Sequence, residues 1–238
     1  MPVKSTIFAT LAVILLLAST LKAQDLSSRL SQPANYQPKA VTTLQQLIEV
    51  AQHYRVPMGI EWVGKTEAVA LPESPKAPRV SDLINAILQN APGYVAQQRD
   101  GVLHIAKTDF LDKRENFLNL RIATFQIQNA DVFDAEFMLR ASIRLRLSPG
   151  QSGYNGGHGH GTPHDGGFDK ENITFAGNDL AVRDILSKVA TANGNALWVV
   201  QFSASEKMAE FPFRALVSLN DGKTLPDFQW QFIPLAKL

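Results

Sequence analysis

The chain has 238 residues, of which 45% are hydrophobic and 19% are charged, and its formal net charge at pH 7 is +1. This composition is typical of a globular protein with one large domain or two small ones, and it excludes wholesale disorder and a protein of many membrane spans. The near-neutral charge gives no bulk attraction to nucleic acid, so we expect no nucleic-acid partner.

Residues 1–23 are predicted to be a cleaved secretory signal peptide. Lys4 supplies the positive start, residues 7–18 the apolar core and residues 21–23 a small-residue cleavage site. Because the apolar run is shorter than the roughly 20 residues that cross a bilayer, we expect no transmembrane span in the mature chain. The chain contains no cysteine, which excludes disulfide bonds and thiol catalysis. An exported chain without disulfides suits the bacterial periplasm or envelope, so we expect a periplasmic or secreted protein.

The segment after the signal peptide is predicted to be a flexible leader over residues 24–39, because it is polar and has no hydrophobic period. A helix is predicted to begin at Thr43, since Thr43 and Gln46 have the spacing of a capping box. Its apolar stripe has helical spacing and consists of Leu44, Leu47, Ile48 and Ala51. Pro57 prevents its continuation, and residues 58–63 are predicted to form a strand.

A second amphipathic helix is predicted to begin at Val80 and to stop before the Pro-Gly pair at 92–93. Residues 94–98 and 102–106 then read as two strands around the Asp-Gly pair at 100–101, which is a strong hairpin signal.

The second half of the chain begins with a predicted strand over residues 120–127 and a predicted helix over residues 131–141. Apolar and arginine side chains alternate over residues 143–147, which predicts a further strand. The arginines here form a basic cluster that consists of Arg140, Arg144 and Arg146. On an exposed strand this cluster either meets an acidic partner or lipid phosphates, or is a solvated face opposite the core.

Residues 173–202 are predicted to hold a strand, an amphipathic helix over 181–193 and a second strand over 197–202. The apolar stripe of this helix consists of Val182, Ile185, Leu186 and Val189. The side-chain oxygens of Asn178 and Asp179 are predicted to cap its first turn.

The tail is predicted to form a β-hairpin from residues 211–219 and 228–235 around the Asn-Asp-Gly turn at 220–222. The three tryptophans, each in a different predicted strand, are expected to pack in the core, and they are Trp62, Trp198 and Trp230. A binding surface is the alternative for Trp230.

Enzyme signatures are weak in this sequence. Asp82 and Asp184 each fall in the first turn of a predicted helix, where a carboxylate favours the positive end of the helix dipole, so we expect a structural role. His53 and His104 stand alone in the sequence and are expected to be structural as well.

Two helices of the chain share one pattern. Residues 80–84 and 182–186 both follow the order apolar, polar, Asp, apolar, apolar, and a glycine follows each helix. This repeat predicts an α+β protein of two small helix-and-strand modules of βαβ type. The first module is predicted to span 40–108, and the second 109–238, with a Gly/His-rich insertion at 149–169 and the hairpin at its end.

The apolar helix at 44–51, the strand at 60–63, residues 80–84, the Pro-Gly-Tyr at 92–94 and residues 101–105 together carry a resemblance. They resemble the short N-terminal domain shared by secretins and TonB-dependent receptors. The resemblance covers residues 40–106 well and residues 120–202 less well. It implies small βαβ-type sandwiches that serve as periplasmic signalling or docking modules. No barrel or pore sequence follows them, so we expect a free or docked periplasmic protein.

Our first hypothesis is therefore a non-enzymatic protein-interaction module without a cofactor, whose partner is an envelope or outer-membrane protein. It docks by strand addition or through a groove beside a module helix, and it predicts an exposed sheet edge. Another hypothesis is a binder of small ligands, with a pocket between the two modules.

The alternative is a metal-binding protein or a metal-dependent enzyme, and it depends on the Gly/His-rich insertion. His158, His160 and His164, with Asp165, lie in a glycine-rich loop that can wrap around one ion. A polar insertion on which nothing packs accounts for the same composition.

The metal alternative predicts that the full chain binds zinc stoichiometrically. The triple variant His158→Ala, His160→Ala and His164→Ala is expected to lose this binding, because it removes all three imidazoles. Isothermal titration calorimetry of both proteins measures the stoichiometry. Equal zinc binding by the native chain and the triple variant favours the alternative, in which the Gly/His-rich insertion binds no metal.

Overall fold

The structure is a computed structural model that describes residues 25–64, 79–147, 172–193, 196–202, 217–218 and 228–235. The helices are α2 (Asp25–Ser31), α3 (Thr43–Tyr54), α4 (Val80–Leu88), the short 3-10 helix η1 (Phe117–Asn119), α5 (Val132–Leu147) and α6 (Val182–Asn193). The strands are β1 (Met58–Val63), β2 (Tyr94–Arg99), β3 (Val102–Lys107), β4 (Arg121–Ala130), β5 (Ile173–Ala181), β6 (Ala196–Phe202), β7 (Val217–Ser218) and β8 (Phe228–Pro234). The expected α+β class is confirmed.

A mixed six-stranded sheet with the order β2-β3-β1-β6-β8-β7 forms the centre of the protein. β1 pairs in parallel with β3 on one side and with β6 on the other, while β2, β8 and β7 join in antiparallel fashion. Three strands come from the predicted module 40–108 and three from the predicted module 109–238. The parallel pairing of β1 with β6 joins these two parts of the chain in one sheet.

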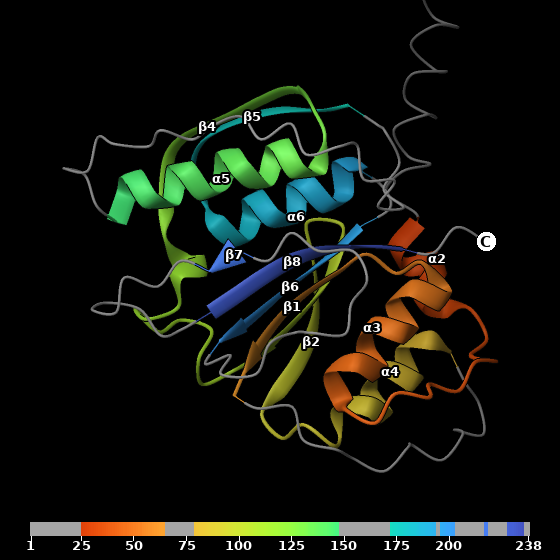
Figure 1. Ribbon diagram of the computed structural model, residues 1–238. Helices are drawn as coiled ribbons and strands as arrows, with labels where there is room; N and C mark the ends of the chain where they lie inside the picture. Colours follow the sequence, from red (N-terminus) through yellow and green to blue (C-terminus); the bar gives the residue numbers. More distant parts are fainter. Residues whose placement is uncertain are drawn as a thin grey trace, which may run out of the picture.

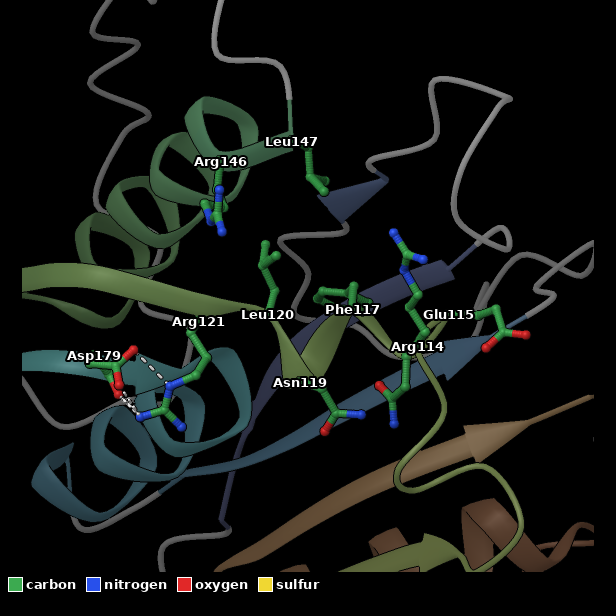
Figure 2. A pocket seen from close by; sticks show the side chains of 10 residues that line it. Arg114, Glu115, Phe117, Asn119, Leu120, Arg121, Arg146, Leu147 and Asp179 are labelled. Atoms are coloured by element: carbon green, nitrogen blue, oxygen red, sulfur yellow. Dashed lines mark hydrogen bonds and ion pairs between the residues drawn. The ribbon is translucent and has the colours of Figure 1, made fainter.

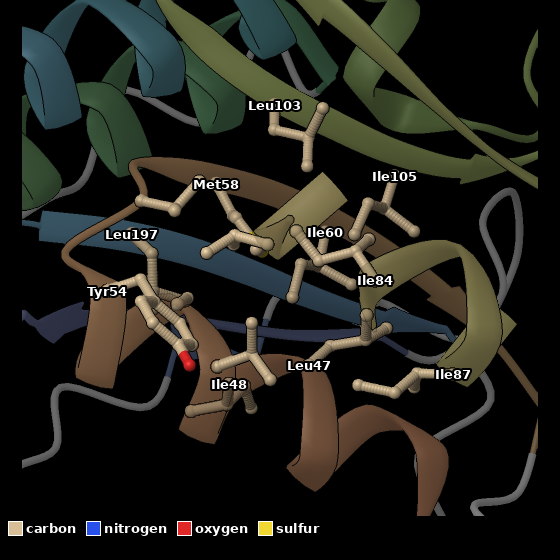
Figure 3. Close-up of a cluster of buried hydrophobic side chains, with 14 of the residues drawn as sticks. Leu47, Ile48, Tyr54, Met58, Ile60, Ile84, Ile87, Leu103, Ile105 and Leu197 are labelled. Carbon is tan, nitrogen blue, oxygen red and sulfur yellow. The ribbon is translucent and has the colours of Figure 1, made fainter. Parts of the chain in front are cut away.

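Helices cover both faces of this sheet (Figure 1). α2, α3 and α4 cover one face and enclose a core that includes Ile60 and Leu197 (Figure 3). α5, α6 and the separate β4–β5 sheet cover the other face, where Trp198 and Trp230 are buried. Because both faces are covered, all seven residues of β6 are buried, as its continuous apolar run indicates.

The predicted helix and strand pattern is largely confirmed where the structure describes it. α3, β1, α4, the β2–β3 hairpin, β4, β5, α6 and β6 all match predicted elements. β7 and β8 pair as the predicted hairpin does, although its turn at 220–222 lies outside the described residues, as does the predicted signal peptide. All three tryptophans are buried, and the surface alternative for Trp230 is wrong because its side chain is only 1% exposed.

The flexible leader predicted for residues 24–39 is wrong in its first half. Residues 25–31 form α2, and Leu26 and Leu30 lie one helical turn apart and are buried in the core beside α4. The backbone N–H of Val80 also donates to the carbonyl of Gln32 at 2.9 Å. The segment is ordered because two leucines and a backbone hydrogen bond attach it, although its polar residues hide that pattern.

α3 begins at Thr43, as predicted, but its cap lies one residue before the predicted capping box. The cap is Thr42, whose hydroxyl oxygen accepts from the backbone N–H of Gln45 at 3.3 Å. The side chain of Thr43 is instead buried inside the helix packing. The neighbouring threonine takes the cap because Thr43 points to the core.

The strand predicted over residues 143–147 is wrong, because α5 continues to Leu147. Ile143 is buried one turn after Leu139 and so extends the helical stripe. Arg144 and Arg146 lie in the last turn, where positive charge is favourable beside the helix C-terminus. The three arginines of the basic cluster therefore lie on a helix.

The predicted caps of α6 are also wrong. Asn178 and Asp179 belong to β5, and their side chains bond across to β4 instead of to the helix. The carboxylate of Asp179 accepts from Arg121, and Asn178 accepts from the Thr124 hydroxyl at 3.3 Å. The first-turn positions predicted for Asp82 and Asp184 are confirmed, and Asp82 accepts from the backbone N–H of Arg79 at 3.1 Å.

Unpaired sheet edges exist among the described residues. β2 is at the border of the large sheet, and neither β4 nor β5 pairs with a further described strand. No described helix has both the length and the apolar character that a membrane crossing requires.

Gly59 on β1 allows a close approach of two strands, because the indole ring of Trp198 on the neighbouring strand occupies the space of its missing Cβ. We predict that Gly59→Ala lowers the free energy of unfolding by about 1–3 kcal/mol through overpacking. Urea denaturation measures this loss. In the background of Trp198→Phe the loss is expected to shrink, since the smaller ring leaves room, and an equal loss in both backgrounds contradicts overpacking as the cause.

Candidate functional site

A buried charged cluster lies between the large sheet and α6, around Glu61 of β1. Its carboxylate is 1% exposed and lies 2.7 Å from Nε2 of His104 on β3. Asn116 donates to it at 2.8 Å, and Arg183 of α6 donates to both carboxylate oxygens. Arg183 also donates to the side-chain oxygen of Asn119 at 2.8 Å. Every charged group of this cluster is therefore bonded to another protein group.

These contacts determine the ionisation of Glu61. Burial by itself raises the pKa of Glu61, but hydrogen bonds from His104 and Arg183 and the nearby positive charge outweigh burial and lower the pKa to about 2. The carboxylate is thus charged at neutral pH and fastens β1, β3, α6 and the 116–119 segment together. The expected structural role of His104 fits this position.

A second buried carboxyl behaves in the opposite way. Glu136 of α5 is 3% exposed, and its Oε1 accepts from the indole N–H of Trp230 at 3.0 Å. Burial raises the pKa of Glu136 to about 8, and neither that hydrogen bond nor the charge of Arg140 offsets it. Glu136 therefore holds a proton at neutral pH.

The outward face of α5 is apolar, although the opposite face of the same helix packs on the core. Phe137 is 38% exposed, Met138 is 42% exposed and Leu145 is 64% exposed. Among the described residues the only other exposed large hydrophobic side chain is Val41. Three of these four side chains thus share one helix, which makes its outward face a candidate interaction surface.

Positive charge borders this apolar face at the end of α5. Arg144 and Arg146 are exposed in the last turn, on either side of Leu145. Exposed acids, Asp131 and Asp134, lie instead at the beginning of the helix. The outward face of α5 is therefore acidic in its first turn, apolar at residues 137, 138 and 145, and basic at its C-terminal end.

A cavity of about 990 Å³ lies beyond this basic end. Its wall is built by residues 114–117 and 119–121, by Arg146 and Leu147 of α5, and by Asp179 of β5 (Figure 2). All of these residues belong to the predicted second module, so the cavity does not lie between the two predicted modules. Its size is that of a small-molecule site, which typically has about 300–1,000 Å³.

One ion pair closes a side of the cavity. Nε and Nη2 of Arg121 donate to the carboxylate of Asp179 at 2.7 and 2.8 Å (Figure 2). The hydrogen bond from Arg121 lowers the pKa of Asp179, and the same bond raises that of Arg121. Both groups stay charged at neutral pH, and each neutralises the other.

The predicted metal ligands His158, His160, His164 and Asp165 lie outside the described residues. Within the described part of the chain there is no group of three or more His, Asp or Glu side chains that could hold a metal ion. The metal hypothesis therefore stays a prediction from the sequence.

The Glu61 cluster was not predicted from the sequence, but a signal for it exists. Glu61 interrupts an otherwise apolar strand, and Arg183 lies beside the apolar stripe of a helix. A charge inside an apolar pattern indicates a buried partner of opposite charge. The outward face of α5 was missed because residues 143–147 were assigned to a strand.

Comparisons with protein-family models, with curated proteins and with solved structures find no match. The resemblance of residues 40–106 to the short N-terminal domain of secretins and TonB-dependent receptors stays a prediction.

The raised pKa of Glu136 predicts that this residue destabilises the protein at alkaline pH. The unfolded chain loses its proton near the ordinary value of 4.5, whereas the folded chain keeps it until about pH 8. Glu136 therefore does not lower the free energy of unfolding below pH 4.5, but it lowers that free energy progressively as pH rises from 4.5 toward 8. We expect Glu136→Gln to stabilise the protein at pH 8 by up to about 4 kcal/mol and to change little at pH 4.5.

Glu61→Gln is the matched variant, and it is expected to change stability with pH in the opposite direction to Glu136→Gln. Because the pKa of Glu61 is lowered, its contribution is complete above pH 4.5 and is lost as pH falls toward 2. At pH 7 the variant is expected to be less stable by about 3 kcal/mol or more, since Arg183 loses its buried partner. Denaturant unfolding at several pH values measures both effects, and equal pH profiles for the two variants contradict the assignments.

Proposed function

We propose that this protein is a non-enzymatic docking module of the bacterial periplasm that binds an envelope protein through the outward face of α5. The observation that carries the proposal is the concentration of Phe137, Met138 and Leu145 on one helix whose other face is already packed. A group of exposed apolar side chains on one face of a folded protein is typical of an interaction surface.

The order of large and small side chains along this face suits an elongated partner segment. Phe137 and Met138 lie in one turn, the small Ala141 in the next turn and Leu145 one turn further. The hydroxyl of Ser142 bonds back to the carbonyl of Met138 at 2.9 Å and so does not compete for the partner. A small residue between large ones lets a partner backbone approach closely, as in helix-to-helix packing.

Charge indicates the chemistry of the partner. Arg144 and Arg146 border the apolar strip at its C-terminal end. A partner segment with an apolar stripe and acidic residues near these arginines matches both features. We therefore assign the surface to an acidic amphipathic segment, most simply a helix.

The sheet edges suit docking less well than the helix does. β4 and β5 have unpaired edges, but Asn129 and Asp179 have positive φ values of 54° and 50°, and the register shifts between Ile127 and Ala130. Irregularities of this kind protect an edge against strand addition. Along β2, the side chain of Gln98 bonds to Ser27 of α2 at 3.4 Å.

Two further features support a binding role in the periplasm. The signal-like segment at 1–23 favours export. The two buried carboxyls among the described residues, Glu61 and Glu136, are bonded to protein side chains and are not offered to a substrate. Both features agree with a docking module of the kind that the resemblance implies.

We predict that the folded full chain binds a synthetic helical peptide that has a leucine stripe flanked by glutamates. Met138→Asp and Leu145→Asp are each expected to weaken this binding by at least about ten-fold, because a charge enters the buried strip. Fluorescence anisotropy of the labelled peptide measures the affinity.

The matched control variant is Val41→Asp, which places the same charge on the exposed apolar residue that lies away from α5. It is expected to bind the peptide as the native chain does. A peptide with lysines in place of the glutamates is expected to bind more weakly. Equal losses in all three variants, or equal binding of both peptides, contradict the proposal.

In cells, a photo-crosslinking residue at position 137 tests whether one envelope protein contacts this face. We expect a discrete product that Leu145→Asp removes and that a crosslinker at position 41 does not form. The captured segment is expected to be acidic and amphipathic, and a basic segment contradicts the assignment.

A further inference from the structure

The cavity beyond the end of α5 contains two cationic groups that no described residue neutralises. Arg114 and Arg146 line it, and neither forms an ion pair with another residue that the structure describes. The third arginine of the wall, Arg121, is already paired with Asp179. Glu115 is the one remaining acid of the wall, so the cavity keeps an excess of positive charge.

Apolar side chains line the same cavity. Leu120 and Leu147 are half-buried and pack against the second core with their inner sides. In Figure 2 these leucines and Phe117 lie between Arg146 on one side and Arg114 on the other. A ligand that fits this wall needs an apolar body as well as a negative charge.

The wall is also anchored. The side chain of Asn119 donates to the carbonyl oxygens of Leu111 and Lys113 at 2.9 and 3.1 Å, and its oxygen accepts from Arg183. Asn116 is held by Glu61 in the buried cluster. The segment that carries Arg114 is thus attached to the sheet before a ligand arrives, which lowers the entropic cost of binding.

We propose that this cavity binds a soluble amphiphilic carboxylate, such as a medium-chain fatty acid. Arg114 and Arg146 lie on opposite sides of the apolar wall (Figure 2), so the guanidinium group of one of them pairs with the carboxylate and the other adds to the positive field, since arginine pairs well with this planar anion. Leu120 and Leu147 receive the hydrocarbon body. This site shares Arg146 with the border of the outward face of α5, but its wall contains neither Phe137 nor Met138.

The test is calorimetric titration of the full chain with decanoate below its micellar concentration. We expect one saturable site, with much weaker binding of acetate, which lacks the body, and of decanol, which lacks the charge. The double variant Arg114→Ala and Arg146→Ala is expected to weaken decanoate binding by at least about ten-fold, the usual loss for one charge-assisted bond. Leu147→Ser is expected to weaken decanoate binding and to leave acetate binding unchanged.

Lys113→Ala is the matched control, because Lys113 is an exposed cation of the same segment that does not line the cavity. It is expected to bind decanoate as the native chain does. An equal loss in Lys113→Ala, or equal binding of acetate and decanoate, overturns the proposal. Thermal unfolding shows whether each variant is folded, and the more conservative Arg114→Gln and Arg146→Gln replace a variant that is not.

Two further arms of the experiment distinguish the carboxylate site from peptide docking and from lipid binding. Met138→Asp is expected to bind decanoate normally, so loss of peptide docking and loss of the ligand site are distinguishable. Binding to vesicles that contain phosphatidylglycerol is expected to be the same for Arg114→Ala as for the native chain. Arginine-dependent vesicle binding without decanoate binding overturns the proposal in favour of a lipid headgroup.

Discussion

The pairing of Glu61 with Arg183 is the interaction on which the rest of the structure depends. A carboxylate buried in the middle of a sheet is costly unless it is paired, and here the partner comes from α6, 122 residues further along the chain. His104 and Asn116 complete the set of contacts. The cluster therefore requires β1, β3, α6 and the segment before β4 to be in place together, and so it specifies how the two parts of the chain meet.

The same cluster lies close to the two proposed binding surfaces. α6 packs beside α5, and the segment at 114–120 lies next to the end of α5, so both surfaces adjoin elements that the cluster holds. α5 differs from the other helices because it is apolar on two faces. Its inner face packs on the core, and its outer face presents Phe137 and Met138. A helix with apolar side chains on two faces has a weak amphipathic pattern.

The two proposed binding surfaces are adjacent and chemically related. Arg146 faces the cavity, while its neighbour Leu145 belongs to the outward face of α5. Both surfaces combine apolar side chains with arginine, so both select partners that are apolar and negatively charged. The difference lies in shape, since a helix face accepts an elongated segment and a cavity of about 990 Å³ accepts a small molecule.

The sequence by itself determined most of the helices and strands, because helical or alternating periods depend only on neighbouring residues, as in α3 and β6. The sequence was ambiguous at residues 143–147, where the spacing of the apolar residues fits both a helix and a strand. This ambiguity hid the outward face of α5. Only the tertiary structure decided the pairing of β1 with β6 and the contact of Glu61 with Arg183. Such contacts join residues that are distant in the chain, and their partners leave no local pattern in the sequence.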